Sequence, residues 1–124
     1  MTNPGFEISN DPNRLDFKFI HRFLTNSYWA KARTYTQVKT SIDHSFCFGL
    51  YIGGRQIGFA RVVTDRAVFA HLIDVFIVPG ERGKGYSKRF LEIILDHAEL
   101  QQVNHWTLKT KDAHRLYEKF GFGL

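Results

Sequence analysis

The sequence has one cysteine, Cys47, and no apolar run that approaches the length of a membrane-spanning helix. A single cysteine excludes an intrachain disulfide framework and offers no zinc-ligand spacing. We therefore expect a reducing, cytoplasmic location. The first five residues lack the basic and apolar regions of a signal peptide. These absences predict a protein with no membrane partner and no bound metal.

The basic residues form no long run, although the net charge is +5. Such a charge suits a polyanionic ligand such as a nucleotide, and it would also suit nucleic acid. The dispersal of the basic residues disfavours nucleic acid. Hydrophobic residues make up 44% of the chain and aromatic residues 15%, which predicts one packed domain over residues 1–124.

The hydrophobic pattern changes period along the chain. It predicts a strand at 6–9, a helix over 12–24 that begins at Asp11-Pro12, and a second helix capped by Thr36. A three-stranded antiparallel meander follows at 47–52, 56–63 and 69–78, with a hairpin at Gly53-Gly54 and a turn at Asp65-Arg66. A helix over 86–98 then leads to a strand at 106–109, parallel to the strand that holds Asp74. The fold class is α+β, with a central mixed, mostly antiparallel sheet flanked by helices.

A glycine-rich, basic loop joins the strand at 69–78 to the helix that follows it. It reads Val78-Pro79-Gly80-Glu81-Arg82-Gly83-Lys84-Gly85-Tyr86-Ser87-Lys88-Arg89. Free N–H groups at a helix start, small residues and four cations predict a seat for a phosphate. A Walker loop does not fit, because Gly85 follows Lys84. A dinucleotide fingerprint does not fit either, because its third glycine position is Lys88.

The segment Arg82-x-x-Gly85-x-Ser87 resembles the Arg/Gln-x-x-Gly-x-Gly/Ala motif of the Gcn5-related N-acetyltransferases (the GNAT family). A second segment resembles the family's Asn/Asp-Ala-x-x-x-Tyr-x-x-x-Gly-Phe helix: Asp112-Ala113-His114-Arg115-Leu116-Tyr117-Glu118-Lys119-Phe120-Gly121-Phe122. The resemblance implies a GNAT-like, three-layer α/β/α fold. Residues 46–122 would form the acetyl-coenzyme A-binding core, and residues 1–45 would form variable helices on the acceptor side.

The resemblance also implies which residues meet acetyl-coenzyme A, the one cofactor expected. Backbone groups of the strand and loop would hold the pantetheine arm and the pyrophosphate, and Ser87 departs from the usual Gly or Ala while staying small. The implied cofactor-binding residues are Phe76, Ile77, Val78, Arg82, Gly83, Lys84, Gly85, Tyr86, Ser87, Lys88 and Asp112. A backbone N–H near Phe76 or Ile77 would stabilise the oxyanion of the reaction.

Two residues are candidates for catalysis, each with an alternative. By the resemblance, Tyr117 lies near the cofactor sulfur and protonates the departing thiolate; by periodicity alone it is a core aromatic. Asp74 is a carboxylate inside an apolar strand. It is either a general base with a raised pKa, acting directly or through water, or a structural residue held by a salt bridge or by a hydrogen-bonded turn neighbour.

Several other residues carry weaker signals. His71 and Tyr28 are candidates for lining the acceptor pocket, whereas Trp29 and Tyr35 are assigned to packing and Cys47 to the core. Four further histidines have no metal spacing and are assigned to the surface: His44, His97, His105 and His114.

These observations predict an N-acetyltransferase that moves an acetyl group from acetyl-coenzyme A to a primary amine by direct attack in a ternary complex. The alternatives are a non-catalytic coenzyme A-binding module and a basic nucleic-acid binder. Small amines, polyamines, aminoglycosides, amino acids and peptide amines remain open as acceptors, and the net charge slightly disfavours strongly cationic ones. Members of the family usually continue with another strand after Gly121-Phe122. We expect either that this strand is short here or that the sheet edge is completed otherwise, for instance in a homodimer.

Overall fold

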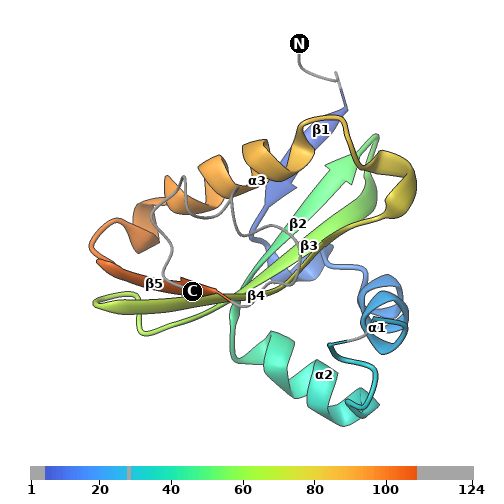
Figure 1. Ribbon diagram of the computed structural model, residues 1–124, viewed down its shortest axis with the longest axis horizontal. Coiled ribbons are helices and arrows are strands. Elements are labelled where there is room, and N and C mark those ends of the chain that lie inside the picture. The colour runs from blue at the N-terminus through green and yellow to red at the C-terminus, as the bar shows by residue number, and fades with distance from the viewer. Residues whose placement is uncertain (1–4, 28, 109–124) are drawn as a thin grey trace.

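The computed structural model describes residues 5–27 and 29–108. Its centre is a five-stranded sheet in the order β1-β2-β3-β4-β5 (Figure 1). The first four strands pair antiparallel with their neighbours, and β5 pairs parallel to β4. The strand bounds are β1 Phe6–Ser9, β2 Phe46–Ile52, β3 Arg55–Thr64, β4 Phe69–Ile77 and β5 His105–Leu108. The expected first strand, meander and parallel strand are confirmed.

Both expected turns of the meander are present. Gly53 and Gly54 join β2 to β3 with φ values of 57° and 81°, a conformation that glycine adopts without steric cost. Asp65 organises the turn between β3 and β4, since its Oδ1 accepts bonds from the N–H groups of Val68, Ala67 and Phe69. These backbone bonds hold the pKa of Asp65 below its ordinary value.

The expected helix over 12–24 is wrong in its first turn. Residues Pro12–Arg14 form a short 3₁₀ turn, Leu15 is extended, and α1 spans Phe17–Thr25. Asp16 is the N-cap, because its Oδ1 accepts a bond from the N–H of Phe19 at 3.1 Å. Its own N–H donates to Gln56 Oε1 at 2.8 Å, which holds the chain extended at the point where a continuous helix would turn.

The cap expected at Thr36 is also wrong. Helix α2 spans Tyr35–Asp43 and begins at Thr34, whose side chain accepts from the N–H of Gln37. The Gln37 side chain accepts from the N–H of Thr34 in return, which completes a capping box. Helix α3 spans Tyr86–Leu95, and a separate 3₁₀ turn at Ala98–Leu100 follows it, so the helix is shorter than expected.

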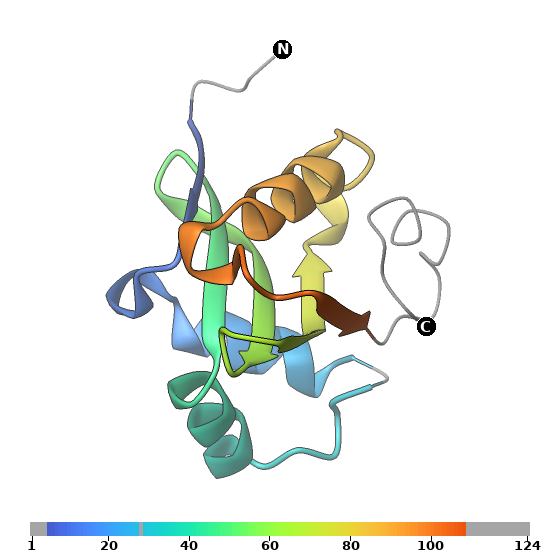
Figure 2. The ribbon, with the colours of Figure 1, turned by 90° about the vertical axis from the view of Figure 1, so that its left-hand side faces the viewer.

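The helices cover both faces of the sheet, as Figures 1 and 2 show. Helix α3 packs on one face over the larger core cluster, which includes Phe48, Leu72 and Phe90. Helices α1 and α2 pack on the other face over a second cluster, which includes Ile20 and Phe59. The α+β fold with three layers is therefore confirmed. The expected helix after Asp112, with Tyr117, lies outside the described residues.

Candidate functional site

The loop after β4 is exposed at the start of α3. A short 3₁₀ turn at Pro79–Glu81 precedes Gly83 and Gly85, which have φ values of 77° and 83°. Gly85 is the N-cap of α3 and offers no side chain to the first-turn N–H groups, which have no partner within a helix. Apart from its chain neighbours, no atom of residues 5–27 and 29–108 would lie within 4 Å of a Cβ atom placed on either glycine. The loop therefore has room for an anion beside backbone donors.

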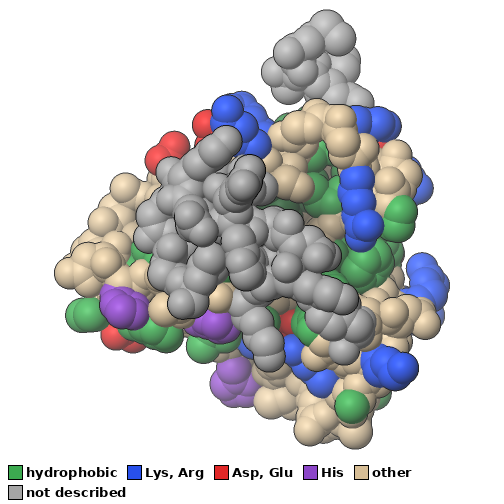
Figure 3. Space-filling view, viewed as in Figure 1, with side chains coloured by type: hydrophobic (Ala, Val, Ile, Leu, Met, Phe, Trp, Pro, Cys, Tyr) green, Lys and Arg blue, Asp and Glu red, His purple; other side chains and the backbone are tan. Residues whose placement is uncertain are grey.

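The cations of this loop differ in what they contact. Lys84 Nζ lies 2.9 Å from Glu81 Oε1, and this hydrogen bond raises the pKa of Lys84. Arg82 donates from Nε to the carbonyl oxygen of Ile77 at 2.8 Å. Lys88 and Arg89 are exposed on the first turn of α3. In Figure 3, Lys and Arg side chains gather along the right-hand side, where Figure 1 places the loop and α1.

At the end of β4, the backbone N–H groups of successive residues point toward opposite edges of the strand. The N–H of Val78 donates to Ile57 O at 2.9 Å, so Val78 keeps its donor within the protein. Backbone groups alternate in direction along a strand, so those of Ile77 point to the opposite edge. The pairing of β5 with β4 ends at Leu72, well before Ile77. Of Phe76 and Ile77, the Ile77 N–H is therefore the better placed donor for a ligand at this edge.

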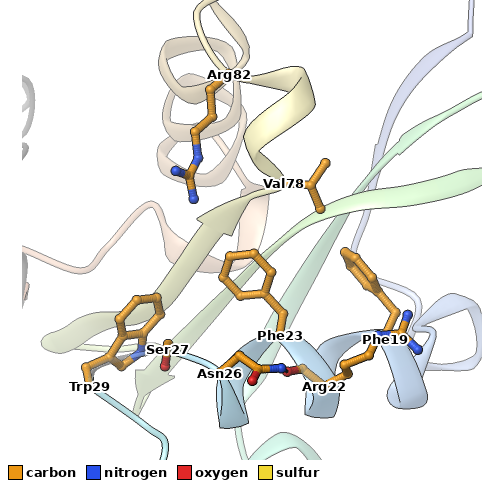
Figure 4. A pocket seen from close by; sticks show the side chains of 8 residues that line it. All are labelled: Phe19, Arg22, Phe23, Asn26, Ser27, Trp29, Val78 and Arg82. Atoms are coloured by element: carbon orange, nitrogen blue, oxygen red, sulfur yellow. The ribbon is translucent and has the colours of Figure 1, made fainter.

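A pocket of about 640 Å³ lies between α1 and the loop after β4 (Figure 4). Phe19, Phe23 and Trp29 supply its aromatic walls. The other lining residues are Arg22, Asn26, Ser27, Val78 and Arg82. In Figure 4, Arg82 and Val78 lie on one side and the α1 residues lie opposite them. Apart from Val78 and Arg82, none of these residues is predicted to contact a ligand from the sequence.

Phe76 packs behind the aromatic wall of this pocket. Its side chain is buried, and its ring stacks on that of Phe23 at 3.9 Å between centroids with the planes 8° apart. The ring of Phe19 lies 5.6 Å from it. The side chain of Phe76 thus positions the pocket wall, so only its backbone remains for the cofactor contact implied by the resemblance.

Asp74 occupies a β-bulge in β4. Phe76 pairs with Phe59 and Ile73 pairs with Arg61, so two residues of β4 stand opposite one residue of β3. Asp74 has a φ of 58°, a left-handed conformation in which Asp is tolerated better than most residues. The bulge lies in the stretch of β4 between the end of the β5 pairing and the pocket.

Three side chains from distant segments bind the Asp74 carboxylate. Trp29 Nε1 donates to Oδ1 at 2.8 Å, while Arg33 Nη1 and Arg61 Nε donate to Oδ2 at 2.7 Å and 2.9 Å. The Asp74 side chain is 1% exposed. Arg61 also donates to Ser45 Oγ. We call these four residues (Trp29, Arg33, Arg61 and Asp74) the Asp74 cluster; it ties the connection between α1 and α2 to β4.

The raised pKa expected for Asp74 is wrong. Burial alone would raise the pKa, but the hydrogen bonds and charges of Arg33 and Arg61 outweigh burial and hold it below the ordinary Asp value. A carboxylate in this environment stays ionised at neutral pH. Of the two interpretations that the sequence left open, the salt bridge is the one that the structure contains.

Other expected site residues have defined surroundings. Tyr86 stacks on Phe6 of β1 with centroids 5.2 Å apart, so its ring packs into the fold. His71 Nδ1 lies 2.8 Å from Thr107 Oγ1 and links β4 to β5. His97 is half-buried and accepts a bond from the N–H of Glu99, so its assignment to the surface is wrong. Tyr28, Asp112 and Tyr117 lie outside the described residues.

Cys47 should resist thiol reagents in the folded protein. Burial raises the pKa of its thiol to about 12, so almost no thiolate exists at pH 8. We expect labelling by a disulfide reagent at pH 8 to be slow in buffer and to reach one thiol per chain in denaturant. Rapid labelling of the native protein would contradict the buried position.

Within residues 5–27 and 29–108, no three His, Cys, Asp or Glu side chains gather as ligands for a metal ion. No helix in these ranges is both long enough and apolar enough to cross a membrane.

The model of the acetyltransferase (GNAT) family matches residues 11–122. The chain belongs to the GNAT family. A crystal structure of a protein from Xanthomonas campestris pv. campestris, assigned to this family, is 44% identical to the chain. The match covers 99% of this chain and 87% of that one, with a TM-score of 0.92.

Two further relatives extend the comparison of this GNAT domain. A Gibberella zeae protein that carries the name acetyltransferase is 27% identical, over 95% of this chain and 78% of its own length. N-acetylglutamate synthase from Neisseria gonorrhoeae, crystallised with coenzyme A and N-acetyl-glutamate, shares the fold with a TM-score of 0.73. It is 16% identical, and the match covers 94% of this chain and 28% of that one.

Proposed function

We propose that this GNAT protein is an N-acetyltransferase that moves an acetyl group from acetyl-coenzyme A to a primary amine by direct attack in a ternary complex. The observation that carries the proposal is the open loop at the start of α3, directly beside the pocket that Arg82 and Val78 line. A donor seat and an acceptor pocket in contact allow the two substrates to meet without a covalent enzyme intermediate.

The loop fits the pyrophosphate of coenzyme A. The empty space over Gly83 and Gly85 would fill if either residue had a side chain, and the first-turn N–H groups of α3 face that region. The backbone from Arg82 to Lys88 would hold the pyrophosphate, with the exposed Lys88 adding charge. When bound, acetyl-coenzyme A supplies a thioester, which is both the acetyl donor and the source of a thiol leaving group.

The described residues suggest how the chain promotes the transfer. The Ile77 N–H would donate to the thioester oxygen as negative charge grows there. The bond from Arg82 Nε to the Ile77 carbonyl oxygen fixes the next peptide group, between Ile77 and Val78. Tyr117, which lies outside the described residues, would donate a proton to the departing sulfur, and the attacking amine would release its own proton to solvent water. Asp74 stays ionised and bound by two arginines, so we assign it the role of holding the β4 bulge next to the transfer site.

A free-thiol assay with acetyl-coenzyme A and a panel of amines tests this function. Because Cys47 is buried, the protein itself should contribute little background signal. We expect amine-dependent thiol release together with one acetylated product per thiol. Tight coenzyme A binding without thiol release for any amine would favour the non-catalytic binding module instead.

Replacing Tyr117 with Phe should lower turnover by roughly a hundredfold, the usual contribution of a positioned general acid, with little change in coenzyme A affinity. Steady-state kinetics and a binding titration measure the two quantities separately. Tyr35→Phe is the control, since Tyr35 is an exposed phenol on α2. If Tyr117→Phe and the unsubstituted protein were equally active, Tyr117 would be a packing residue and not a proton donor.

A further inference from the structure

The charge of the pocket points to the chemistry of its occupant. Of the described residues that line it, two carry guanidinium groups, Arg22 and Arg82, and none carries a carboxylate. No carboxylate among residues 5–27 and 29–108 pairs with either arginine. The nearest buried acid, Asp74, is balanced by Arg33 and Arg61. Among the described residues, a cationic group in this pocket would therefore meet no compensating charge.

Most polar groups of the pocket wall already form hydrogen bonds within the protein. Ser27 Oγ donates to Leu24 O at 2.6 Å and accepts from the N–H of Ala30. The indole N–H of Trp29 is taken by Asp74, and Asn26 Nδ2 donates to Arg22 O at 2.8 Å. The Nε of Arg82 is bound to Ile77 O, which leaves its terminal nitrogens. The groups that remain for a ligand are mainly guanidinium donors and the Asn26 side-chain oxygen.

The rest of the wall is aromatic and held in place. Phe19 and Phe23 both pack on the buried ring of Phe76. Trp29 is fixed by its bond to Asp74. Because these aromatic side chains are already ordered, binding a ligand costs little further side-chain entropy. An aromatic wall favours a flat or apolar group on the ligand.

We propose that the acceptor is a small amine that also carries a carboxylate and an apolar or aromatic part, with Arg22 as the residue that recognises the carboxylate. The proposal rests on the proposed function and narrows its acceptor class. Guanidinium groups bind carboxylates through charge-assisted, paired hydrogen bonds. Asn26 Oδ1 can accept a bond from the amine. Polyamines and aminoglycosides are disfavoured, since each would bring several cations beside two arginines.

A matched pair of amines tests the carboxylate directly. Phenylalanine and phenethylamine have the same ring and amine and differ in the carboxylate. We expect kcat/KM for phenylalanine to exceed that for phenethylamine by about tenfold or more, the value of one charge-assisted contact. Spermidine should be the poorest of the three. Equal use of the two aromatic amines, or a preference for spermidine, would overturn the proposal.

Variants of Arg22 test the assignment to this residue. Arg22→Ala should raise KM for phenylalanine by about tenfold and leave KM for phenethylamine unchanged. Arg22→Lys should restore part of the difference, and Arg22→Glu should reverse the preference. Lys39→Ala is the control for net charge, because Lys39 pairs with Asp43 on α2 and does not line the pocket. Equal effects of Arg22→Ala on both amines would contradict a carboxylate contact.

Binding measurements separate this proposal from the proposed function. Both aromatic amines can be titrated calorimetrically into the protein saturated with coenzyme A. If no amine is acetylated, the transferase function fails, yet phenylalanine should still bind about tenfold more tightly than phenethylamine and lose this advantage in Arg22→Ala. If acetylation occurs without that difference, the transferase stands and the carboxylate proposal fails.

Discussion

Replacing Gly85 with Glu should abolish coenzyme A binding while the domain stays folded. Gly85 has a φ of 83° and open space where a Cβ would stand. The Glu side chain would project into the region that we assign to the pyrophosphate, where its charge would repel the ligand. Titration of coenzyme A measures the affinity, and thermal unfolding measures the fold.

The chain offers a closely matched control for this substitution. Gly54 has a φ of 81° and equally open surroundings, but it lies in the β2–β3 hairpin. Gly54→Glu should carry the same backbone cost, about 1–2 kcal/mol, and leave coenzyme A affinity unchanged. Gly85→Gln separates steric exclusion from charge repulsion. If Gly85→Glu bound coenzyme A with undiminished affinity, the loop would not be part of the cofactor site.

Replacing Asp74 with Asn should lower the free energy of unfolding by about 3 kcal/mol at pH 7, since it leaves two arginines around a neutral group. Asn tolerates the left-handed conformation of this bulge, so the change tests charge more than backbone strain. Urea unfolding gives the value. Asp43→Asn is the control, because its pair with Lys39 is half exposed at 3.6 Å and should contribute less than about 1 kcal/mol.

The difference in unfolding free energy between the unsubstituted protein and Asp74→Asn should change with pH in one direction. The pKa of Asp74 is lowered in the folded protein, so its contribution is fully present above the ordinary Asp value of 3.8. It is lost as the pH falls below that value toward the folded pKa. The gap between unsubstituted protein and Asp74→Asn should therefore stay constant from pH 7 to about pH 5 and shrink below about pH 4. A gap that closes between pH 7 and pH 5 would contradict the lowered pKa.

The turnover of folded Asp74→Asn protein distinguishes two roles for Asp74, holding the bulge in place and transferring a proton. If Asp74 holds the bulge, turnover per folded molecule should remain within about tenfold of the unsubstituted protein and keep its pH profile. Removing a general base would instead lower turnover by roughly 10²–10⁴-fold and remove the acidic limb of that profile.

The features of this fold that the sequence predicts best are local. Paired Gly53-Gly54 specifies a tight hairpin, and the change from strand to helical spacing across 78–89 places the loop. The errors at the helix starts are also local. Thr34 and Gln37 have the spacing of a capping box, which is a stronger signal than Thr36, and Asp16 stands directly before the apolar stripe of α1.

The Asp74 cluster and the pocket could not be predicted in this way. Arg33 and Trp29 lie more than forty residues before Asp74, and no spacing rule joins them to it. The apolar run around Asp74 correctly indicates burial, but the direction of its pKa depends on which partners the tertiary fold brings there. Arg22 carries no signal either, since an exposed cation on an amphipathic helix is ordinary.

The separation of the two core clusters by the sheet bears on how such a protein can change over evolution. Substitutions in α1 and α2 repack only the smaller cluster, so the pocket that we propose for the acceptor can diverge while the face under α3 keeps its residues. The Asp74 cluster limits that freedom, because a descendant that loses Arg33 or Trp29 leaves a partly unpaired acid in β4. New acceptor specificities should therefore arise first among Phe19, Arg22 and Asn26, whose side chains lie outside that charge network.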